Sequence, residues 1–507
     1  MTMDILSIAT TFLFPLVLIL FLVHRRLRAA PPLPLPPGPR GWPLLGALPL
    51  LSPLPHSALA NLAKRYGPIM YLKLGTRGFA VASSPAVARA FLHTLDVQFA
   101  DRPINNAARN VGYAGEDLVW ADYGPRWKLL RRLSSVHLLG PGAVSQWSSA
   151  RRSELNRMVQ GILNLNRHGK PVEVHGMVMQ GLANILGLAI LSRRVFDSDG
   201  AESSEFKSMV LEVMKLSGLT NIADFIPSMK WLDVNGIERR LKTLHKKFDA
   251  LMTRMLREHA ETAGQREGKQ DFVDHLLANI KSSKGAEMLS DVNIKGLIVD
   301  MFIAGTDTSS ITIEWAFTEL LKNPSKLKRA QLELDEVIGR DRMLEESDIP
   351  KLPYLQAICK EVLRKHATTP LNLPHISNQP CEIDGYYIPE GTRLLVNIYA
   401  IGRDPDVWEN PLEFNPERFL SGNIAKIDVK GTDFELIPFG AGRRICAGKY
   451  LGMLFVQSIL GTLIHAFDWK MPDGVEVDME ESAGLALQKA NPITAFATPR
   501  LAPSAYH

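Results

Sequence analysis

Apolar residues recur at three- and four-residue spacing through much of the middle of the chain, and this spacing predicts helices with one buried face. The helices predicted in this way cover residues 127–136, 155–165, 237–258 and 272–280. A longer and more apolar pattern starts at the cap pair Ser290 and Asp291 and ends at Lys322, before an Asn-Pro pair. This helix has too few polar residues for a surface position, so we expect it to cross the core.

Alternation of apolar and polar residues, which is typical of strands, is less frequent. It occurs early in IMYLKL (69–74) and FAVAS (79–83), and late in CEIDGYYIPEGTRLLVN (381–397). The stretch 402–419 is dense in proline, asparagine and aspartate and predicts an ordered succession of turns. The whole pattern predicts a mainly α fold with small β sheets.

The N-terminal residues 5–23 form an uncharged apolar run about as long as a membrane-spanning helix, which needs ~20 residues. Asp4 precedes the run and the basic sequence HRRLR follows it, whereas a cleaved signal peptide has a basic start and a shorter apolar stretch. We predict a single membrane span, with everything after Arg25 in the cytosol. The alternative is a buried core helix, but nothing precedes this run to pack against it.

A proline-rich segment, PPLPLPPGP at 31–39, predicts a stiff extended hinge after the span. No second linker of this composition and no internal repeat follows it. The predicted organisation is therefore a membrane anchor at 1–28, a hinge at 29–39 and a single catalytic domain at 40–507.

Composition excludes several classes of protein. The 507-residue chain has only three cysteines, which are Cys359, Cys381 and Cys446. They are too few and too far apart for a disulfide framework, and no Cys-x-x-Cys pair offers a zinc site. The net charge is +5, but acidic and basic residues are interleaved, as in GIERRLKTLHKKFD, so we predict no nucleic-acid binding.

Cys446 lies in the sequence PFGAGRRICAGKY, residues 438–450, among arginines and glycines. A thiolate is an electron-rich metal ligand, and nearby cations, a helix start or a metal lower the pKa of a thiol. An isolated cysteine in a loop is more often buried and inert. The constrained pattern Phe439-x-x-Gly442-x-Arg444-x-Cys446-x-Gly448 argues against that reading and marks Cys446 as a metal ligand.

This pattern resembles the haem-binding loop of the cytochrome P-450 monooxygenases. The resemblance implies that Cys446 is the axial thiolate of haem b, with the other four residues of the pattern around the cofactor. In WKLLR, Trp127 and Arg131 resemble the family pair that reaches a haem propionate. His375 stands where we expect an arginine aimed at a propionate.

Another pair, Glu361 and Arg364 in KEVLR, has the i, i+3 spacing of a surface ion pair, which alone contributes little. The resemblance implies that this pair joins Arg418 of NPERF in a buried structural triad without a catalytic role.

The sequence AGTDTS, residues 304–309, places Gly305, Thr306 and Thr308 inside the long predicted helix, which they weaken. The resemblance implies that the Thr308 hydroxyl faces the dioxygen site. It also implies that Asp307 and ordered water relay protons to Thr308 through a locally opened helix. The alternative is a polar kink in a core helix.

The resemblance implies a monooxygenase that inserts one atom of O2 into a C–H bond. No flavin or nicotinamide motif appears in the chain, so the electrons must come from a partner. In membrane-anchored members that partner is NADPH-cytochrome P-450 reductase. Candidate cations for its acidic docking face are Lys128, Arg132, Arg443 and Lys449. The expected location is the endoplasmic reticulum membrane.

Four longer stretches resemble the plant flavonoid B-ring hydroxylases: YGPRWKLLRRLSSVHLLG, NIADFIPSMKWLD, TPLNLPHIS and GLALQKANPI. Ala486 stands where 3'-hydroxylases tend to carry threonine, which favours the 3',5'-hydroxylases, with naringenin and dihydrokaempferol as implied substrates. The alternatives are a 3'-hydroxylase or other phenylpropanoid hydroxylase, a haem-thiolate isomerase or dehydratase, and a non-catalytic haem sensor. The expected pocket walls, which are mostly apolar, are 111–119, 216–224, 302–306, 368–373 and 485–493.

Three residues depart from the family pattern. Ala367 replaces an expected proline, His375 replaces an arginine, and Asn491 replaces an apolar residue. A histidine near its ordinary pKa of about 6.5 is an unreliable cation at neutral pH. We therefore expect weaker propionate anchoring than in the family pattern.

Overall fold

The computed structural model describes residues 33–51, 53–196, 201–219, 221–233, 235–266, 268–282, 288–482, 484 and 486–506. The predicted membrane span at 5–23 lies outside these residues. Within the described part, one helix is long and apolar enough to cross a membrane, α9 (Val174–Leu191), and 72% of it is buried inside the protein. A helix covered to this extent is a core helix.

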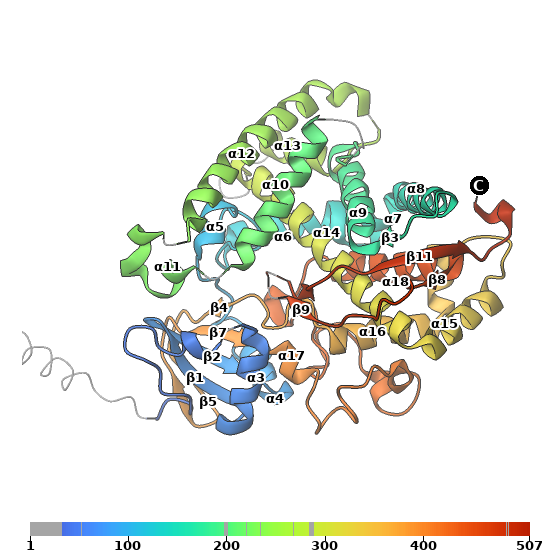
Figure 1. The fold of residues 1–507 in the computed structure, drawn as a ribbon. Helices are drawn as coiled ribbons and strands as arrows, with labels where there is room; N and C mark the ends of the chain where they lie inside the picture. Colours follow the sequence, from blue (N-terminus) through green and yellow to red (C-terminus); the bar gives the residue numbers. More distant parts are fainter. Residues whose placement is uncertain are drawn as a thin grey trace, which may run out of the picture.

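The fold is mainly helical, and its small sheets lie in different places: strands coloured blue lie together at the lower left, whereas strands coloured red lie among the helices on the right (Figure 1). The predicted helices are present as α6 (Pro125–Ser134), α8 (Ser148–Arg167), α12 (Ile237–Glu261) and α13 (Phe272–Ser282). Further helices are α3 (Pro55–Tyr66), α4 (Pro85–Arg89), α5 (Asn106–Asn110), α7 (Pro141–Gln146), α10 (Ala201–Gly218), α11 (Ile222–Phe225), α15 (Pro324–Val337) and α17 (Ile398–Ile401).

The long helix α14 (Asp291–Lys322) has the predicted bounds. At its start the Ser290 hydroxyl accepts the Asn293 N–H at 3.2 Å, and the Asn293 side chain accepts the Ser290 N–H at 3.0 Å. This reciprocal capping satisfies two backbone donors that a helix start otherwise leaves unpaired. Asn323, followed by proline, ends the helix.

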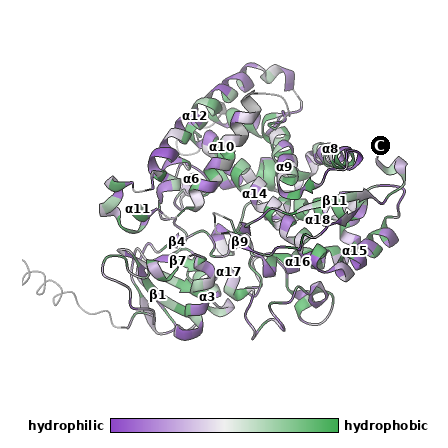
Figure 2. Ribbon diagram, in the orientation of Figure 1, coloured by the Kyte–Doolittle hydropathy of each residue, from purple (hydrophilic) through white to green (hydrophobic). Residues whose placement is uncertain are grey.

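Helix α14 crosses the core between α9, α16 (Pro353–Lys365) and α18 (Lys449–Ala466). Figure 2 shows that α9 and α14 are largely hydrophobic, whereas α12 and α15 at the periphery are mixed. Gly305 permits the close approach of α14 to α9, because a Cβ atom there would lie 2.8 Å from the Leu186 side chain. This packing explains the glycine of the AGTDTS sequence.

The strands form four small sheets. The largest has the order β1 (Ile69–Leu74), β2 (Arg77–Ala82), β7 (Arg393–Val396), β4 (His375–Ile376), and β2 and β7 are parallel. The other sheets are β5 (Cys381–Ile383) with β6 (Tyr386–Ile388), β9 (Glu481–Ser482) with β10 (Gln488–Lys489), and β3 (Val172–Glu173), β11 (Thr494–Pro499) and β8 (Phe467–Lys470). The mainly α fold with small sheets is confirmed.

The described part of the hinge is attached to the sheets. The Pro34 carbonyl accepts the Tyr387 N–H at 2.8 Å, and the Pro37 carbonyl accepts the Tyr71 N–H at 3.0 Å. A Cβ atom at Gly38 would lie 2.0 Å from the Tyr71 carbonyl oxygen, so the hinge packs directly on β1. These contacts fix the direction in which the chain enters the globular body.

Glu361, Arg364 and Arg418 lie together in the interior. The Glu361 carboxylate accepts two hydrogen bonds from Arg364, at 2.7 and 2.8 Å, and Arg418 Nε lies 3.1 Å from it. Arg364 also donates to the carbonyls of Gly402 and Pro411 in the predicted succession of turns. The ion pair therefore clamps this segment onto α16.

Candidate active site

The Cys446 loop leads directly into α18. The Cys446 N–H donates to the Phe439 carbonyl at 2.9 Å, which closes the loop. Gly442 has φ +68, and a Cβ atom there would lie 2.2 Å from the Leu92 carbonyl oxygen. Gly442 is thus needed for contact with another segment of the protein.

Burial raises the pKa of the Cys446 thiol, and the Gly448 N–H and the charges of Arg131 and Lys449 only partly oppose this effect. The nearby cations and the helix start therefore do not by themselves lower the pKa of this thiol. Desolvation disfavours the thiolate more than the nearby cations favour it. A metal that binds the sulfur supplies the missing stabilisation of the anion.

Cys446 is nevertheless exposed, and so is Ala304 in the middle of the central helix α14. The flanking residues Phe302 and Thr306 are buried. The exposed thiol is accessible to the metal of a cofactor.

A group of cationic side chains lies near this loop. Arg102 donates to the carbonyls of Leu373 and Pro374 at 2.6 and 2.8 Å, and Arg444 stacks on Trp127 at 4.8 Å from the ring centroid. Within the described part of the chain, Arg102 Nε and Arg444 Nη1 are buried without a hydrogen-bond partner. Unpaired guanidinium donors of this kind suit carboxylates.

Burial lowers the pKa of Arg102 to about 9 and that of Arg444 to about 10. Burial also lowers the pKa of His375 far below its ordinary value, and the charge of Arg102 adds to this effect. His375 Nδ1 lies 2.7 Å from the Phe99 carbonyl oxygen. His375 is therefore neutral, and Arg102, which we did not single out from the sequence, contributes the positive charge at this place.

These residues fit a haem, which needs one axial ligand and partners for two propionate groups. Cys446 offers a soft sulfur ligand, which suits iron. Arg102 and Arg444 offer guanidinium groups, and Trp127 is buried beside Arg444. Arg131 also lies near the thiol, since the charge on Cys446 acts on its pKa.

Thr308 and Asp307 lie on neighbouring positions of α14. The Thr308 hydroxyl donates to the Ala304 carbonyl at 2.6 Å, and Thr312 donates to the Thr308 carbonyl at 2.8 Å. The helix is continuous through this stretch, which corrects the expectation of a locally opened helix. Hydroxyl bonds to the i−4 carbonyl accommodate the threonines without breaking the helix.

Two of the expected pocket walls, 111–119 and 485–493, have different contacts in the structure. The Asp300 carboxyl group accepts the N–H groups of Leu118 at 2.8 Å and Val119 at 3.2 Å, so the 111–119 wall is fixed to α14. Asn491, in contrast, is exposed and donates to Asp478 at 2.9 Å. Ala367 is buried in the core, 1% exposed.

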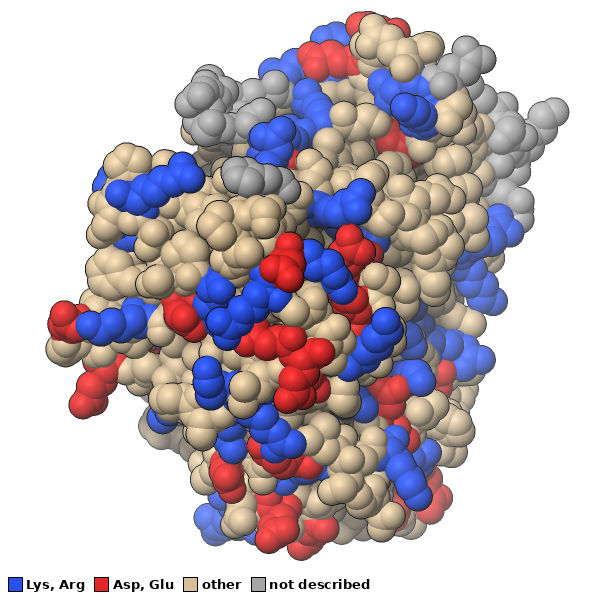
Figure 3. Space-filling model, turned by 90° about the vertical axis from the view of Figure 1, so that its right-hand side faces the viewer, with Lys and Arg blue, Asp and Glu red and all other residues tan. Residues whose placement is uncertain are grey.

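Two of the candidate docking cations, Lys128 and Arg443, flank the Tyr123 ring at 5.0 and 5.5 Å. Arg443 also pairs with Asp96 at 2.7 Å. Another candidate, Lys449, donates to the Lys430 carbonyl at 3.0 Å. On the face shown in Figure 3, basic and acidic side chains are interleaved, as they are in the sequence.

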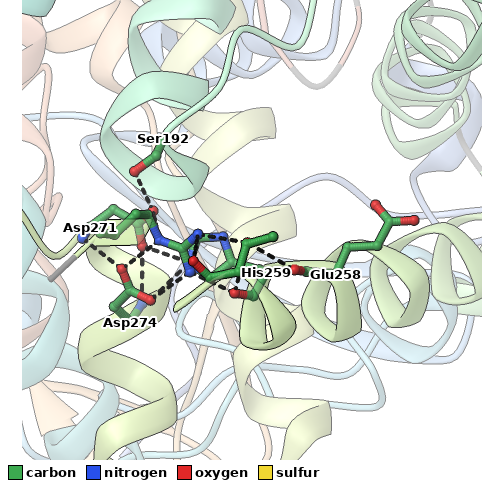
Figure 4. Close-up of polar contacts among 7 residues, drawn as sticks. Ser192, Glu258, His259, Asp271 and Asp274 are labelled. Atoms are coloured by element: carbon green, nitrogen blue, oxygen red, sulfur yellow. Dashed lines mark hydrogen bonds and ion pairs between the residues drawn. The ribbon is translucent and has the colours of Figure 1, made fainter. Parts of the chain in front are cut away.

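A separate polar cluster joins the ends of α9, α12 and α13 (Figure 4). His259 Nε2 lies 3.1 Å from both Asp271 and Asp274. Within the described part of the chain, this is the one group of such residues close enough to hold a metal ion. Arg266 pairs with Asp274 at 2.9 Å, and Ser192 donates to Asp271 at 2.6 Å. The carboxylates already have cationic and hydroxyl partners, so the cluster is a structural junction.

Comparison with known proteins identifies the family to which the chain belongs. The model of the family Cytochrome P-450 matches residues 36–496. The chain belongs to the cytochrome P-450 family. The family implies haem with cysteine-thiolate ligation of the iron, and the chain is a haem-thiolate monooxygenase.

Several plant relatives are similar over most of their length. The chain is 60% identical to a flavonoid 3',5'-hydroxylase of Eustoma exaltatum subsp. russellianum, over 92% of each chain. It is 58% identical to the flavonoid 3',5'-hydroxylase of Solanum melongena, over 92% of this chain and 91% of the relative. A flavonoid 3'-monooxygenase of Petunia hybrida is 45% identical, over 99% of this chain and 100% of the relative.

A solved structure has the same fold. It is a zebra fish cytochrome P-450 with progesterone, which superimposes with a TM-score of 0.77 at 28% identity and covers 88% of this chain and 99% of its own. The predicted family, fold class and enzyme class are therefore confirmed. The roles assigned to individual residues stay predictions.

Proposed function

We propose that the chain hydroxylates the B-ring of flavonoids at the 3' and 5' positions, with flavanones and dihydroflavonols such as naringenin and dihydrokaempferol as substrates, in anthocyanin biosynthesis. One observation carries this proposal. Identity to the 3',5'-hydroxylases of Eustoma and Solanum is 60% and 58%, whereas identity to the Petunia 3'-monooxygenase is 45%. The buried Ala486, 4% exposed, fits the same branch.

Each residue of the site has a proposed role. Haem, when bound, supplies the oxygen chemistry that hydroxylates an aromatic C–H bond. Cys446 Sγ would hold its iron, and Arg102, Arg444 and the Trp127 N–H would pair with its propionates. The loop residues Phe439, Gly442 and Gly448 keep the sulfur in place.

Protons reach the reacting oxygen through the middle of α14. Burial raises the pKa of Asp307, so this carboxyl group binds a proton more readily than an exposed aspartate does. In this proposal the hydroxyl of Thr308, the residue that follows Asp307 on α14, is the next group along the path. A positioned acid of this kind typically contributes ~100-fold or more to a rate.

The electrons come, in this proposal, from NADPH through the partner reductase. The basic residues Lys128, Arg132, Arg443 and Lys449 support its docking, and the N-terminal apolar run supports anchoring in the endoplasmic reticulum membrane. Charge reversal of the four residues should lower the reductase-supported rate and its salt dependence. An unchanged rate with unchanged salt dependence would remove this surface from the proposal.

Product analysis tests the substrate. The full chain is expressed in microsomes with the reductase and given naringenin and NADPH. We expect products with one and then two added hydroxyl groups on the B-ring. A single hydroxylation at 3' would indicate the 3'-hydroxylase, and haem binding without any hydroxylated flavonoid would contradict the proposal.

A further inference from the structure

His175, which no motif in the sequence marks, lies next to Asp307. His175 belongs to the first turn of α9, which packs along α14. Its Nε2 atom lies 3.8 Å from Asp307 Oδ1, and its Nδ1 atom lies 3.3 Å from Glu314 Oε2. Asp307 and Glu314 are seven residues apart, two turns along one face of the helix. The imidazole thus bridges two carboxyl groups of α14.

The surroundings of His175 favour its charged form. A helix N-terminus disfavours a cation, and burial also lowers the pKa of the imidazole. The carboxylates of Glu314, Asp307 and Glu173 overcome both effects and raise the pKa of His175 above its ordinary value. The fourth charged group nearby, Lys489, acts on Glu314 from β10.

Solvent reaches this place from the N-terminal end of α9. The His175 side chain is 18% exposed, whereas the Asp307 and Glu314 side chains are 10% and 2% exposed. Glu173, two residues before His175, is exposed, and its carboxylate accepts the Gly176 N–H at 3.0 Å in the first turn of α9. His175 is therefore the most accessible of three linked titratable groups, and Asp307 is the member next to Thr308.

We propose that His175 supplies protons to Asp307 and that Glu314 positions the imidazole for this transfer. This inference rests on the proposed function, in which Asp307 passes protons to Thr308. In each transfer the Nε2–H bond of the imidazolium breaks and an O–H bond forms at Asp307 Oδ1. The imidazole becomes neutral and takes its next proton from water.

The geometry suits a transfer that is switched by small movements. A separation of 3.8 Å is an ion-pair distance, and proton transfer requires an approach to about 2.8 Å, which rotation of either side chain provides. Glu314 is held by its other oxygen, which accepts the Ile493 N–H at 2.9 Å. A lysine or arginine at this position would form a permanent ion pair, whereas histidine releases its proton near neutral pH. His175 acts on the reaction only through Asp307. For this reason we call it a positioning residue and not a catalytic residue.

Hydrogen exchange tests the link without turnover. The exchange rate of the imidazole C2 hydrogen, followed by mass spectrometry against pH, gives the pKa of each histidine in the haem-loaded enzyme. We expect the pKa of His175 to lie above about 6.5 and to fall in both Asp307→Asn and Glu314→Gln. His168, whose Nδ1 atom lies 2.8 Å from the Asn164 carbonyl oxygen, is the internal control and should not change. An unchanged His175 pKa in both variants would overturn the inference.

The share of NADPH electrons that ends in product tests how this proton supply affects the reaction. In His175→Gln we expect the share of NADPH electrons that appears in product, rather than in hydrogen peroxide, to fall about tenfold. This loss is smaller than the ~100-fold typical of a direct proton donor, because Asp307 can still draw protons from water. The wild-type share should decline as pH rises through the pKa of His175, and this decline should be absent in the variant. His168→Gln should match the wild type.

The outcomes separate the two proposals. If His175→Gln keeps both the wild-type share and its pH profile, the proton supply through His175 is wrong and the proposed function stands. If the wild-type enzyme hydroxylates no flavonoid, the proposed function is wrong, and the hydrogen-exchange result alone then decides for or against the inference.

Discussion

Replacement of Asp300 by asparagine should stabilise the protein at alkaline pH. Asp300 on α14 and Asp117 on the 111–119 wall are both buried, and each carboxyl group acts on the pKa of the other. Burial raises the pKa of Asp300 to about 7. Burial and the neighbouring Asp300 charge raise the pKa of Asp117 well above its ordinary value.

The sign of the pH dependence follows from these pKa values. A carboxyl group whose pKa is raised by folding binds its proton more tightly in the folded than in the unfolded state. Its contribution to stability is complete below the unfolded value of 3.8 and is lost as the pH rises to about 7. Each pH unit corresponds to about 1.4 kcal/mol, so the loss has an upper limit of about 4 kcal/mol. Relaxation of buried sites reduces such values, and we expect about 2 kcal/mol.

Asp300→Asn removes this loss and keeps the local hydrogen bonds. The amide oxygen can still accept the N–H groups of Leu118 and Val119, and the amide nitrogen can donate to Asp117. In guanidinium unfolding at about pH 8, the variant should exceed the wild type by about 2 kcal/mol, and the difference should shrink as the pH falls and disappear below about pH 3.8.

Asp249 provides a control, because its replacement should change the stability in the opposite direction. Asp249 pairs with Lys295 at 2.7 Å, and although burial raises the pKa of Asp249, this partner lowers it below the ordinary value. Asp249→Asn should therefore destabilise the protein at neutral pH, and the loss should vanish in acid. A variant Asp300→Asn that is less stable than the wild type at about pH 8, or that differs equally at both pH values, would refute the reasoning.

Two other substitutions test the clamp and the haem environment. Glu361→Gln should cost about 3–5 kcal/mol in guanidinium unfolding, because it leaves the charges of two buried arginines without a carboxylate, and a cost below about 1 kcal/mol would contradict the clamp. Arg102→Ala should speed haem transfer to apomyoglobin about tenfold, the equivalent of one lost charge-assisted hydrogen bond. His375→Arg should slow that transfer, since a neutral imidazole cannot neutralise a propionate; equal haem loss from wild type and variant would count against this role.

Local signals in the sequence were sufficient for the central helix. The capping residues Ser290 and Asn293 and the Asn-Pro pair at 323–324 act within a few residues, so both bounds of α14 could be predicted. The two-residue strand β3 was not predicted, because it exists only through pairing with the distant strand β11, and β9 and β10, which pair with each other, are too short to show an alternating pattern.

The site could be predicted where its residues form one continuous pattern. The loop around Cys446 and the pair Asp307 and Thr308 are of this kind. Arg102 and His175 were missed, because each is a single polar residue in an ordinary stretch. Their partners lie more than 100 residues away, at Leu373 for Arg102 and at Asp307 for His175, and only folding brings them together.

The central claim is that Cys446 is the thiolate ligand of a haem. The most direct test is the carbon monoxide difference spectrum of reduced microsomes that contain the wild-type chain or Cys446→Ser at equal protein levels. We predict the shifted Soret band of thiolate-ligated ferrous haem in the wild type and its absence in the variant. A wild-type protein that binds haem without this band, or a variant that retains the band, would contradict the account.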